Sequence, residues 1–236
     1  SGTAKAYSYS VNTTAGFSII TYLGNGTSGH QIPHHLGVVP EMIIIKSTSN
    51  VEDWFVYHKE AGNDQDLHLN LTNSAATADS WDNTTPSTTT WTMSNQSAIN
   101  GGNNTHIAYC FASKPGYSKI GAYKGNNSSD GPFGYIGFKP AFVMLKKENG
   151  NTQNWFIYDN QRPFNRNGGI DGQKLRPLFP NTSNTEASAG NYAFDMYSNG
   201  FKVKETGDQT NGNSNKYIYM AFGQTLVGTN NVPCTA

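Results

Sequence analysis

The sequence predicts an all-β protein made of two tandem, homologous antiparallel modules of β-sandwich or jelly-roll type that pack together. Three observations support this fold class: an internal repeat, strand-like segments separated by turns rich in Gly, Asn, Ser and Thr, and the lack of any persuasive helical periodicity. Strands that follow one another without intervening helices are typical of antiparallel sandwiches and barrels.

The repeat is clearest in two segments, GVVPEMIIIKSTSNVEDWFVYHK from Gly37 and GFKPAFVMLKKENGNTQNWFIYDN from Gly137. The match extends upstream to YLGN from Tyr22 and YKGN from Tyr123, and downstream to the last strands of each copy. Two copies of this length indicate paired domains or pseudo-symmetric halves rather than a solenoid. The predicted organisation is a polar N-terminal segment (1–15), a first β module (16–115), a second β module (116–227) and a C-terminal tail (228–236).

Strand-like segments of the first module are rich in β-branched and aromatic residues. The first ends at a Gly-Asn-Gly turn, the second is a nearly continuous apolar run typical of a strand buried on both faces, and the fourth alternates strictly, as a half-buried strand does. The expected strands are 17–22, 41–46, 54–58, 67–72, 91–94 and 106–112.

Composition argues against several classes of partner. The formal net charge is zero, so the basic surface of a nucleic-acid-binding protein is not expected. No apolar run approaches the ~20 residues of a membrane span, so membrane insertion is not expected either. We expect no cofactor, because no P-loop and no dinucleotide-binding glycine motif is present.

The thiols and histidines are expected to serve structure. Cys110 lies in an apolar run and should be a small buried hydrophobe, although a bridge to Cys234 remains open. His30, His34 and His35 have a spacing that resembles a metal motif, but Pro and turn residues between them argue against a helix. We therefore predict no metal site.

Catalysis is not expected. Glycoside hydrolysis needs two carboxylates across a cleft. Glu52 and Asp53 are replaced by Gln153 and Asn154 in the second copy, so this acidic pair is not part of the shared framework. No nucleophile motif of a recognisable kind is present.

Aromatic residues that do not recur between the copies are the best candidates for binding. An exposed ring beside amides and a carboxylate suits sugar recognition, because the ring covers the apolar C–H face while polar groups take the hydroxyls. The alternative, that Trp81 closes the core under a loop, remains open. Phe179 lies in the same long loop of the second module as the other candidates there. The predicted ligand-binding residues are Trp81, Asp82 and Asn83 in the first module and Phe164, Asn165, Arg166 and Asp171 in the second.

The segment YSNGFKVKETGDQTNGNSNKYIYMAFGQ (197–224), together with HIAYCFASKPGYSKIGAYKGN and PAFVMLKK, resembles a family of surface proteins of tailed bacteriophages, labelled tail fibre or virion structural proteins. The resemblance covers about residues 16–230. Its motifs are framework strands and assign no chemistry, and no catalytic residue is carried over from it.

The resemblance implies a component exposed on the surface of the virion. The favoured function is non-enzymatic adhesion of a tail fibre to a bacterial surface polysaccharide, through the loops that differ between the copies. Contacts with other virion proteins are expected, and so is a homotrimer, in which multivalency raises a modest affinity. A purely structural capsid decoration or fibre segment, and a polysaccharide-degrading tailspike domain, remain as alternatives.

Overall fold

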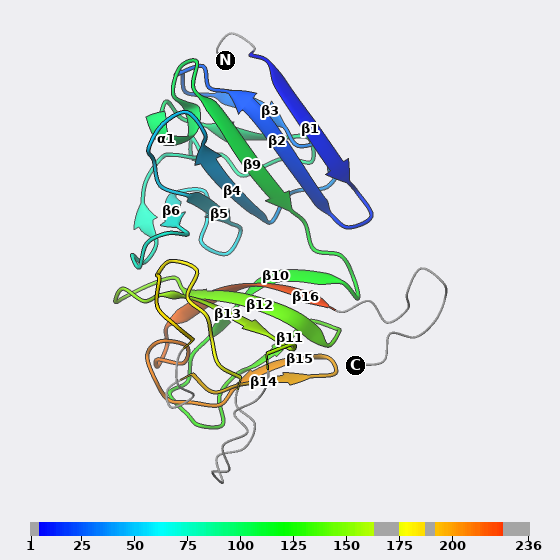
Figure 1. Ribbon diagram of the computed structural model, residues 1–236, viewed down its shortest axis with the longest axis vertical. Coiled ribbons are helices and arrows are strands. Elements are labelled where there is room, and N and C mark those ends of the chain that lie inside the picture. Colours follow the sequence, from blue (N-terminus) through cyan, green and yellow to red (C-terminus); the bar gives the residue numbers. More distant parts are fainter. Residues whose placement is uncertain (1–4, 163–174, 187–191, 224–236) are drawn as a thin grey trace. The chain divides into compact units, whose positions relative to one another are not determined.

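The structure is a computed structural model that describes residues 5–162, 175–186 and 192–223 (Figure 1). The chain divides into two compact units, Ser1–Ser113 (unit 1) and Lys114–Ala236 (unit 2). Both units are built from antiparallel strands, so the predicted all-β class is confirmed. The division after Ser113 falls close to the predicted end of the first module.

Unit 1 contains a seven-stranded antiparallel sheet with the order β1-β2-β9-β4-β5-β6-β7. Its strands are β1 (Tyr7–Asn12), β2 (Phe17–Leu23), β4 (Met42–Ser47), β5 (Phe55–His58), β6 (Gln65–His68), β7 (Ala76–Thr77) and β9 (Thr105–Phe111). A second sheet pairs β3 (His30–Pro33) with β8 (Thr90–Met93), and the short helix α1 (Ser97–Asn100) precedes β9.

Unit 2 contains a four-stranded antiparallel sheet with the order β10-β16-β12-β13. Its strands are β10 (Ser118–Lys124), β12 (Pro140–Lys147), β13 (Trp155–Asp159) and β16 (Lys216–Gly223). The smaller sheet has the order β11-β15-β14 and consists of β11 (Phe133–Tyr135), β14 (Phe194–Tyr197) and β15 (Gly200–Val203).

The repeated sequence folds into a repeated topology. The order β2-β9-β4-β5 in unit 1 matches β10-β16-β12-β13 in unit 2, and the pair β3-β8 matches β11-β15. Gly37 and Gly137, the first residues of the two matched segments, both have a positive φ, 71° and 83°. The prediction of two homologous β-sandwich modules is therefore confirmed.

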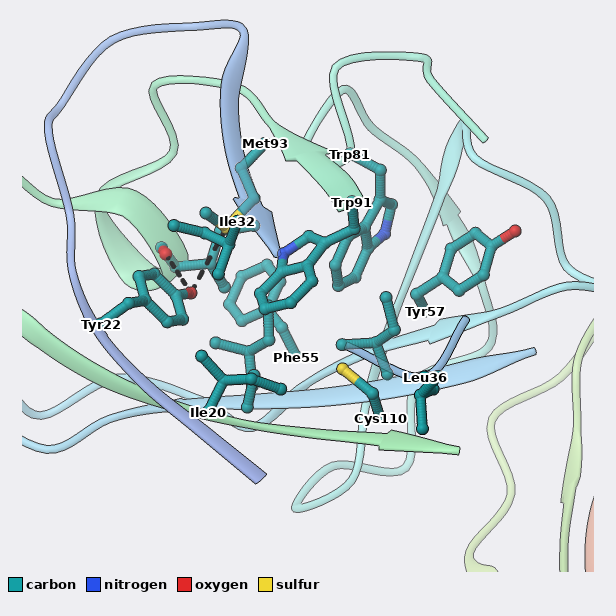
Figure 2. Packing of buried hydrophobic residues seen from close by; sticks show 14 of the residues in the cluster. Ile20, Tyr22, Ile32, Leu36, Phe55, Tyr57, Trp81, Trp91, Met93 and Cys110 are labelled. Carbon is teal, nitrogen blue, oxygen red and sulfur yellow. Dashed lines mark hydrogen bonds between the residues drawn. The ribbon is translucent and has the colours of Figure 1, made fainter. Parts of the chain in front are cut away.

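Each unit buries its core between its larger and its smaller sheet. In unit 1, burial alternates along β2, whose Ile20 and Tyr22 point inward. Figure 2 shows these side chains facing Trp91 and Met93 of β8 and Ile32 of β3. Cys110 is fully buried in this cluster, as predicted.

The core of unit 2 is more aromatic. Tyr158 of the larger sheet stacks on Phe194 of the smaller sheet with ring centroids 4.3 Å apart, and Phe194 stacks on Phe201 at 4.9 Å. Figure 1 shows β11, β15 and β14 as a separate layer across from β12 and β16. Stacked rings of this kind hold the two layers together.

Two equivalent, fully buried asparagines brace the loops at one end of each unit. In unit 1, the amide nitrogen of Asn25 donates to Asn100 Oδ1 at 3.0 Å, and Asn100 Nδ2 donates to the carbonyls of Thr27 at 3.0 Å and Ser94 at 2.6 Å. His30 Nδ1 lies 2.7 Å from Asn100 Oδ1. The Asn100 side chain thus provides hydrogen-bond partners for several backbone groups of a loop that lies outside the sheets.

Asn211 does the same in unit 2. The amide nitrogen of Asn126 donates to Asn211 Oδ1 at 2.8 Å, and Asn211 Nδ2 donates to the carbonyls of Ser128 at 2.8 Å and Glu205 at 2.6 Å. Asn25 and Asn126 occupy matching positions of the repeat. The repeat therefore preserves a buried polar brace as well as an apolar core.

Two details of the strands differ from expectation. The predicted strand 67–72 is largely wrong, because β6 spans Gln65–His68. The side chain of Asn70 accepts from the amide of Trp54 at 2.9 Å and donates to Asp53 at 2.7 Å, in place of a continued strand ladder. The polar N-terminal segment holds the strand β1, which pairs with β2.

Candidate functional site

Trp81 lies in the interior of unit 1. Its side chain is 1% exposed, and its ring meets Tyr57 edge-on with centroids 5.5 Å apart (Figure 2). Its Nε1 donates to the carbonyl of Gln65 at 3.2 Å. Of the two interpretations of Trp81, an exposed binding ring and a ring that closes the core, the second is confirmed, and the polar edge of the indole is satisfied by backbone.

Asp82 and Asn83 form the turn that follows Trp81. Both have a positive φ, 52° and 47°, and the amide of Thr84 donates to the carbonyl of Trp81 at 3.0 Å. Asp82 is half-buried and Asn83 is exposed. Asn and Asp tolerate this left-handed conformation better than most residues, so the turn serves to reverse the chain. Without an exposed ring beside it, the predicted sugar-binding arrangement is not formed here.

The predicted binding residues of the second module, Phe164, Asn165, Arg166 and Asp171, lie outside the described residues. Phe179, from the same loop, is described. It is 8% exposed and meets Phe156 edge-on at 5.6 Å, so it belongs to the core and is not a binding residue.

The histidines of the H-x3-H-H motif have separate structural roles. His30 contacts the buried Asn100, and His34 Nε2 lies 3.1 Å from the carbonyl of Ser87. Burial lowers the pKa of both His30 and His34, which favours the neutral rings. His35 stacks on Tyr9 with centroids 3.6 Å apart.

Within residues 5–162, 175–186 and 192–223, no group of three or more His, Cys, Asp or Glu side chains is arranged to hold a metal ion. The same part of the chain contains no helix that is both long enough and apolar enough to span a membrane.

The candidate site is the outer face of the smaller sheet in unit 2, which we call the aromatic face. Along β11, Phe133 and Tyr135 are exposed while Gly134 between them is buried. Along β14, Phe194 is buried and Tyr197 is exposed. Because side chains alternate between the faces of a strand, these three exposed rings share one face. They are 42% (Phe133), 67% (Tyr135) and 41% (Tyr197) exposed.

The central strand of this sheet carries a glycine where the rings converge. Gly200 pairs with Tyr135 on one side and with Tyr197 on the other. A Cβ at Gly200 would lie 2.8 Å from Phe133 Cζ and 2.2 Å from the carbonyl oxygen of Gly134. The ring of Phe133 therefore lies over Gly200, and its centroid is 5.9 Å from that of Tyr197 at an interplanar angle of 64°.

The aromatic face is backed by the core. On the inner side of the sheet, a Cβ at Gly134 would lie 2.4 Å from Phe201 Cζ, so the Phe201 ring occupies the space beneath β11. Phe201 in turn meets Tyr219 of the larger sheet edge-on at 5.1 Å. Packing on this side fixes the strands from which the exposed rings project.

Charged side chains border the rings. Lys202 pairs with Asp130, and their hydrogen bond raises the pKa of Lys202 and lowers that of Asp130, so both remain charged near neutral pH. The hydroxyl of Tyr197 donates to Asp195 Oδ2 over a long 3.5 Å. The result is a group of apolar rings edged by hydrogen-bonding side chains.

The matching face of unit 1 has a different character. There Gln31 pairs with Thr92 and Pro33 pairs with Thr90. The face carries no aromatic ring at these four positions. At this location, exposed aromatic rings are thus a property of unit 2.

Sequence reasoning missed the aromatic face. The signal that could have found it is Phe-Gly-Tyr at 133–135, two rings separated by a glycine in a strand, together with a third ring, Tyr197, just before the turn at 198–199. The strand period places both β11 rings on one side, but only the pairing of β11 with β15 and β14 brings Tyr197 beside them.

These features define a class: an all-β protein of two homologous sandwich modules, one of which carries an exposed aromatic sheet face. The chain belongs to the family described as Domain of unknown function (DUF7483), whose model matches residues 2–225. The match runs through both units, so the family's sequence unit is the pair of modules. No curated protein and no solved structure matches the chain.

Proposed function

We propose that the chain is a non-enzymatic surface protein of a bacteriophage virion and serves as a receptor-binding module of a tail fibre that adheres to a polysaccharide on the host cell. The observation that carries the adhesive role is the aromatic face of Phe133, Tyr135 and Tyr197. The assignment to a virion rests on the resemblance of the framework strands to phage surface proteins.

The chemistry of the face suits a sugar. A pyranose presents an apolar C–H face, which an exposed aromatic ring covers, and a rim of hydroxyls, which charged and hydroxyl side chains bind. Asp195 and the hydroxyl of Tyr197 provide acceptors and a donor beside the rings. Burying exposed rings against a sugar removes apolar surface from water at low entropic cost, since the rings already pack on the sheet.

Multivalency would strengthen such adhesion. One face of three rings should give a modest affinity, and several copies on one particle raise the avidity without any new contact. A homotrimer and attachment to other virion proteins are therefore part of the proposal.

The test uses the full chain on a glycan array and in adsorption to bacterial cells. The double variant Phe133→Ser/Tyr135→Ser should lose binding to both while retaining its circular dichroism spectrum. Tyr9→Ser is the matched control, because Tyr9 is an exposed tyrosine of unit 1 at 53% exposure and should be dispensable.

A purely structural virion protein is the second candidate, and the same exposed rings could then serve contact with another subunit. In that case, the wild-type protein would bind no glycan and no cells, and the double variant would change the oligomeric state instead. Release of reducing ends from a polysaccharide would support a degrading tailspike domain and contradict the non-enzymatic proposal.

A further inference from the structure

We infer that the ligand of the aromatic face is an uncharged polysaccharide, bound along its chain so that consecutive sugars lie across the three rings. This inference rests on the proposed function and adds the charge and the size of the ligand.

The charges around the face balance. Among the described residues, the acidic side chains beside the face are Asp130 and Asp195, and the basic ones are Lys202 of β15 and Lys204, which follows the end of this strand at Val203. Lys202 already pairs with Asp130, whose carboxylate also senses the charge of Lys204. An acidic polysaccharide would have to displace Asp130 from Lys202 and would meet Asp195, and the described residues of the face include no cluster of cations of the kind that binds polyanions.

The spread of the rings exceeds one sugar. Phe133 and Tyr135 are two residues apart on a strand, which places their Cα atoms roughly 7 Å apart, and Tyr197 adds a third ring whose centroid is 5.9 Å from that of Phe133. A single terminal sugar can cover one ring but not three. A chain of several sugars can contact all of them, so affinity should rise with the length of the oligosaccharide.

The exposed area favours a glycan over a protein partner. A large aromatic side chain offers about 200 Å², so the exposed fractions correspond to roughly 300 Å² of ring surface. A stable protein interface needs about 800 Å² on each partner. The aromatic face is therefore too small by itself for a second copy of the chain, but it is of the size of the functional patches found on monomers.

The experiment measures binding of the full chain to two sets of polysaccharides by affinity electrophoresis and calorimetry. The neutral set is dextran, a β-1,3-glucan and mannan, and the acidic set is alginate and polygalacturonate. We expect binding within the neutral set, with an affinity that changes less than about twofold between about 20 mM and about 500 mM NaCl, because an uncharged ligand forms no ion pair that salt could screen. Within the neutral set, the affinity should rise at least about tenfold from the monosaccharide to the tetrasaccharide, as added sugars contact added rings.

Two variants separate rings from charges. Tyr135→Ser should weaken neutral binding by at least about tenfold, because it removes the most exposed ring. The double variant Asp130→Asn/Lys202→Gln removes the ion pair with no change in net charge and should leave neutral binding within about threefold, as expected for a rim contact.

The outcomes are distinguishable. Binding that is confined to acidic polysaccharides, falls steeply with salt and depends on Lys202 would overturn this inference while leaving glycan adhesion intact. Equal affinity for monosaccharide and tetrasaccharide would overturn the claim about chain length alone. Binding to no glycan, with a changed oligomeric state in Tyr135→Ser, would contradict the inference together with the proposed function.

Discussion

Unit 1 places Asn100 where unit 2 places Asn211, and each buried amide braces the same loop of its own unit. Nearby, the hydroxyl of Tyr22 donates to the carbonyl of Ile99 at 2.7 Å, as the hydroxyl of Tyr123 does to that of Thr210 at 2.8 Å. These two interior contacts are thus the same in both copies of the repeat.

The same comparison also shows where the units have diverged. His106 stacks on Tyr22 at 5.2 Å in unit 1, and Tyr217 stacks on Tyr123 at 5.0 Å in unit 2. The position keeps its stacked ring but changes from a titratable imidazole to a phenol. All six histidines of the chain lie in unit 1, so only that unit has histidines to respond to mild acid.

The outer face of the smaller sheet differs most in chemistry. Unit 1 presents Gln31 and Thr90 where unit 2 presents Phe133 and Gly200. A sheet that is packed on one side can change its other side without disturbing the core. The difference teaches that a duplicated framework can acquire an exposed aromatic surface in one copy while both copies retain the same interior.

The largest expected effect is that of Trp81→Ala. Removing a buried indole leaves a cavity and should destabilise unit 1 by about 4 kcal/mol. Denaturant unfolding, with hydrogen exchange to assign the change to unit 1, measures the loss. Tyr135→Ala in unit 2 is the comparison, and its cost should stay within about 0.5 kcal/mol because the ring is 67% exposed.

Asn100→Ala and Asn211→Ala should each cost about 3 kcal/mol, since several buried backbone partners lose their hydrogen bonds. The two losses should be of similar size, one in each unit, as judged by hydrogen exchange of β9 and of β16. A large loss from one substitution and a negligible loss from the other would show that the braces are not equivalent.

Acid should destabilise unit 1 selectively. Burial lowers the pKa of His106 to about 4, whereas an unfolded histidine titrates near 6.5. Between pH 6.5 and pH 4, the unfolded state binds a proton at His106 that the folded state does not bind. The free energy of unfolding of unit 1 is therefore highest above pH 6.5 and falls as the pH drops from 6.5 to 4. We expect about 3 kcal/mol from this residue.

Stability of unit 1 measured across this pH window tests the prediction. His106→Gln should flatten the profile, and His106→Tyr, which copies unit 2, should do the same if the larger ring is accommodated. A profile that is unchanged in both variants would assign the acid sensitivity to other groups, among them His30 and His34.

The smallest effect concerns Asn70 and Asn181. Asn70 accepts from the amide of Trp54 at 2.9 Å, and Asn181 accepts from that of Trp155 at 3.0 Å. Alanine at either position should cost about 1 kcal/mol, the usual net value of one hydrogen bond. Asn73→Ala, on the exposed chain just after Asn70, is the control and should be neutral.

Local patterns predicted what depends on local physics. The repeat, the strands and the burial of Cys110 could be recognised because apolar residues recur with the strand period. The burial of Trp81 could not be recognised in this way, because it depends on how the loop after β7 folds back over Tyr57 and Gln65. A tryptophan among polar neighbours looks exposed in the sequence even when its partners come from distant strands.

The candidate site was missed for a related reason. Phe133 and Tyr135 are adjacent in one strand, but Tyr197 and Gly200 are more than sixty positions away in the sequence. Strand pairing alone brings them together.

The central claim is that the shared framework builds the interior and that unit 2 alone carries the recognition surface. An amide-resolved footprint of the bound ligand tests this claim most directly. Hydrogen exchange or chemical-shift mapping of the full chain with a neutral polysaccharide should show changes at 133–135 and 195–202. No change is expected at the matching positions of unit 1, 31–33 and 90–92. Changes centred on unit 1, or equal changes in both units, would contradict the account.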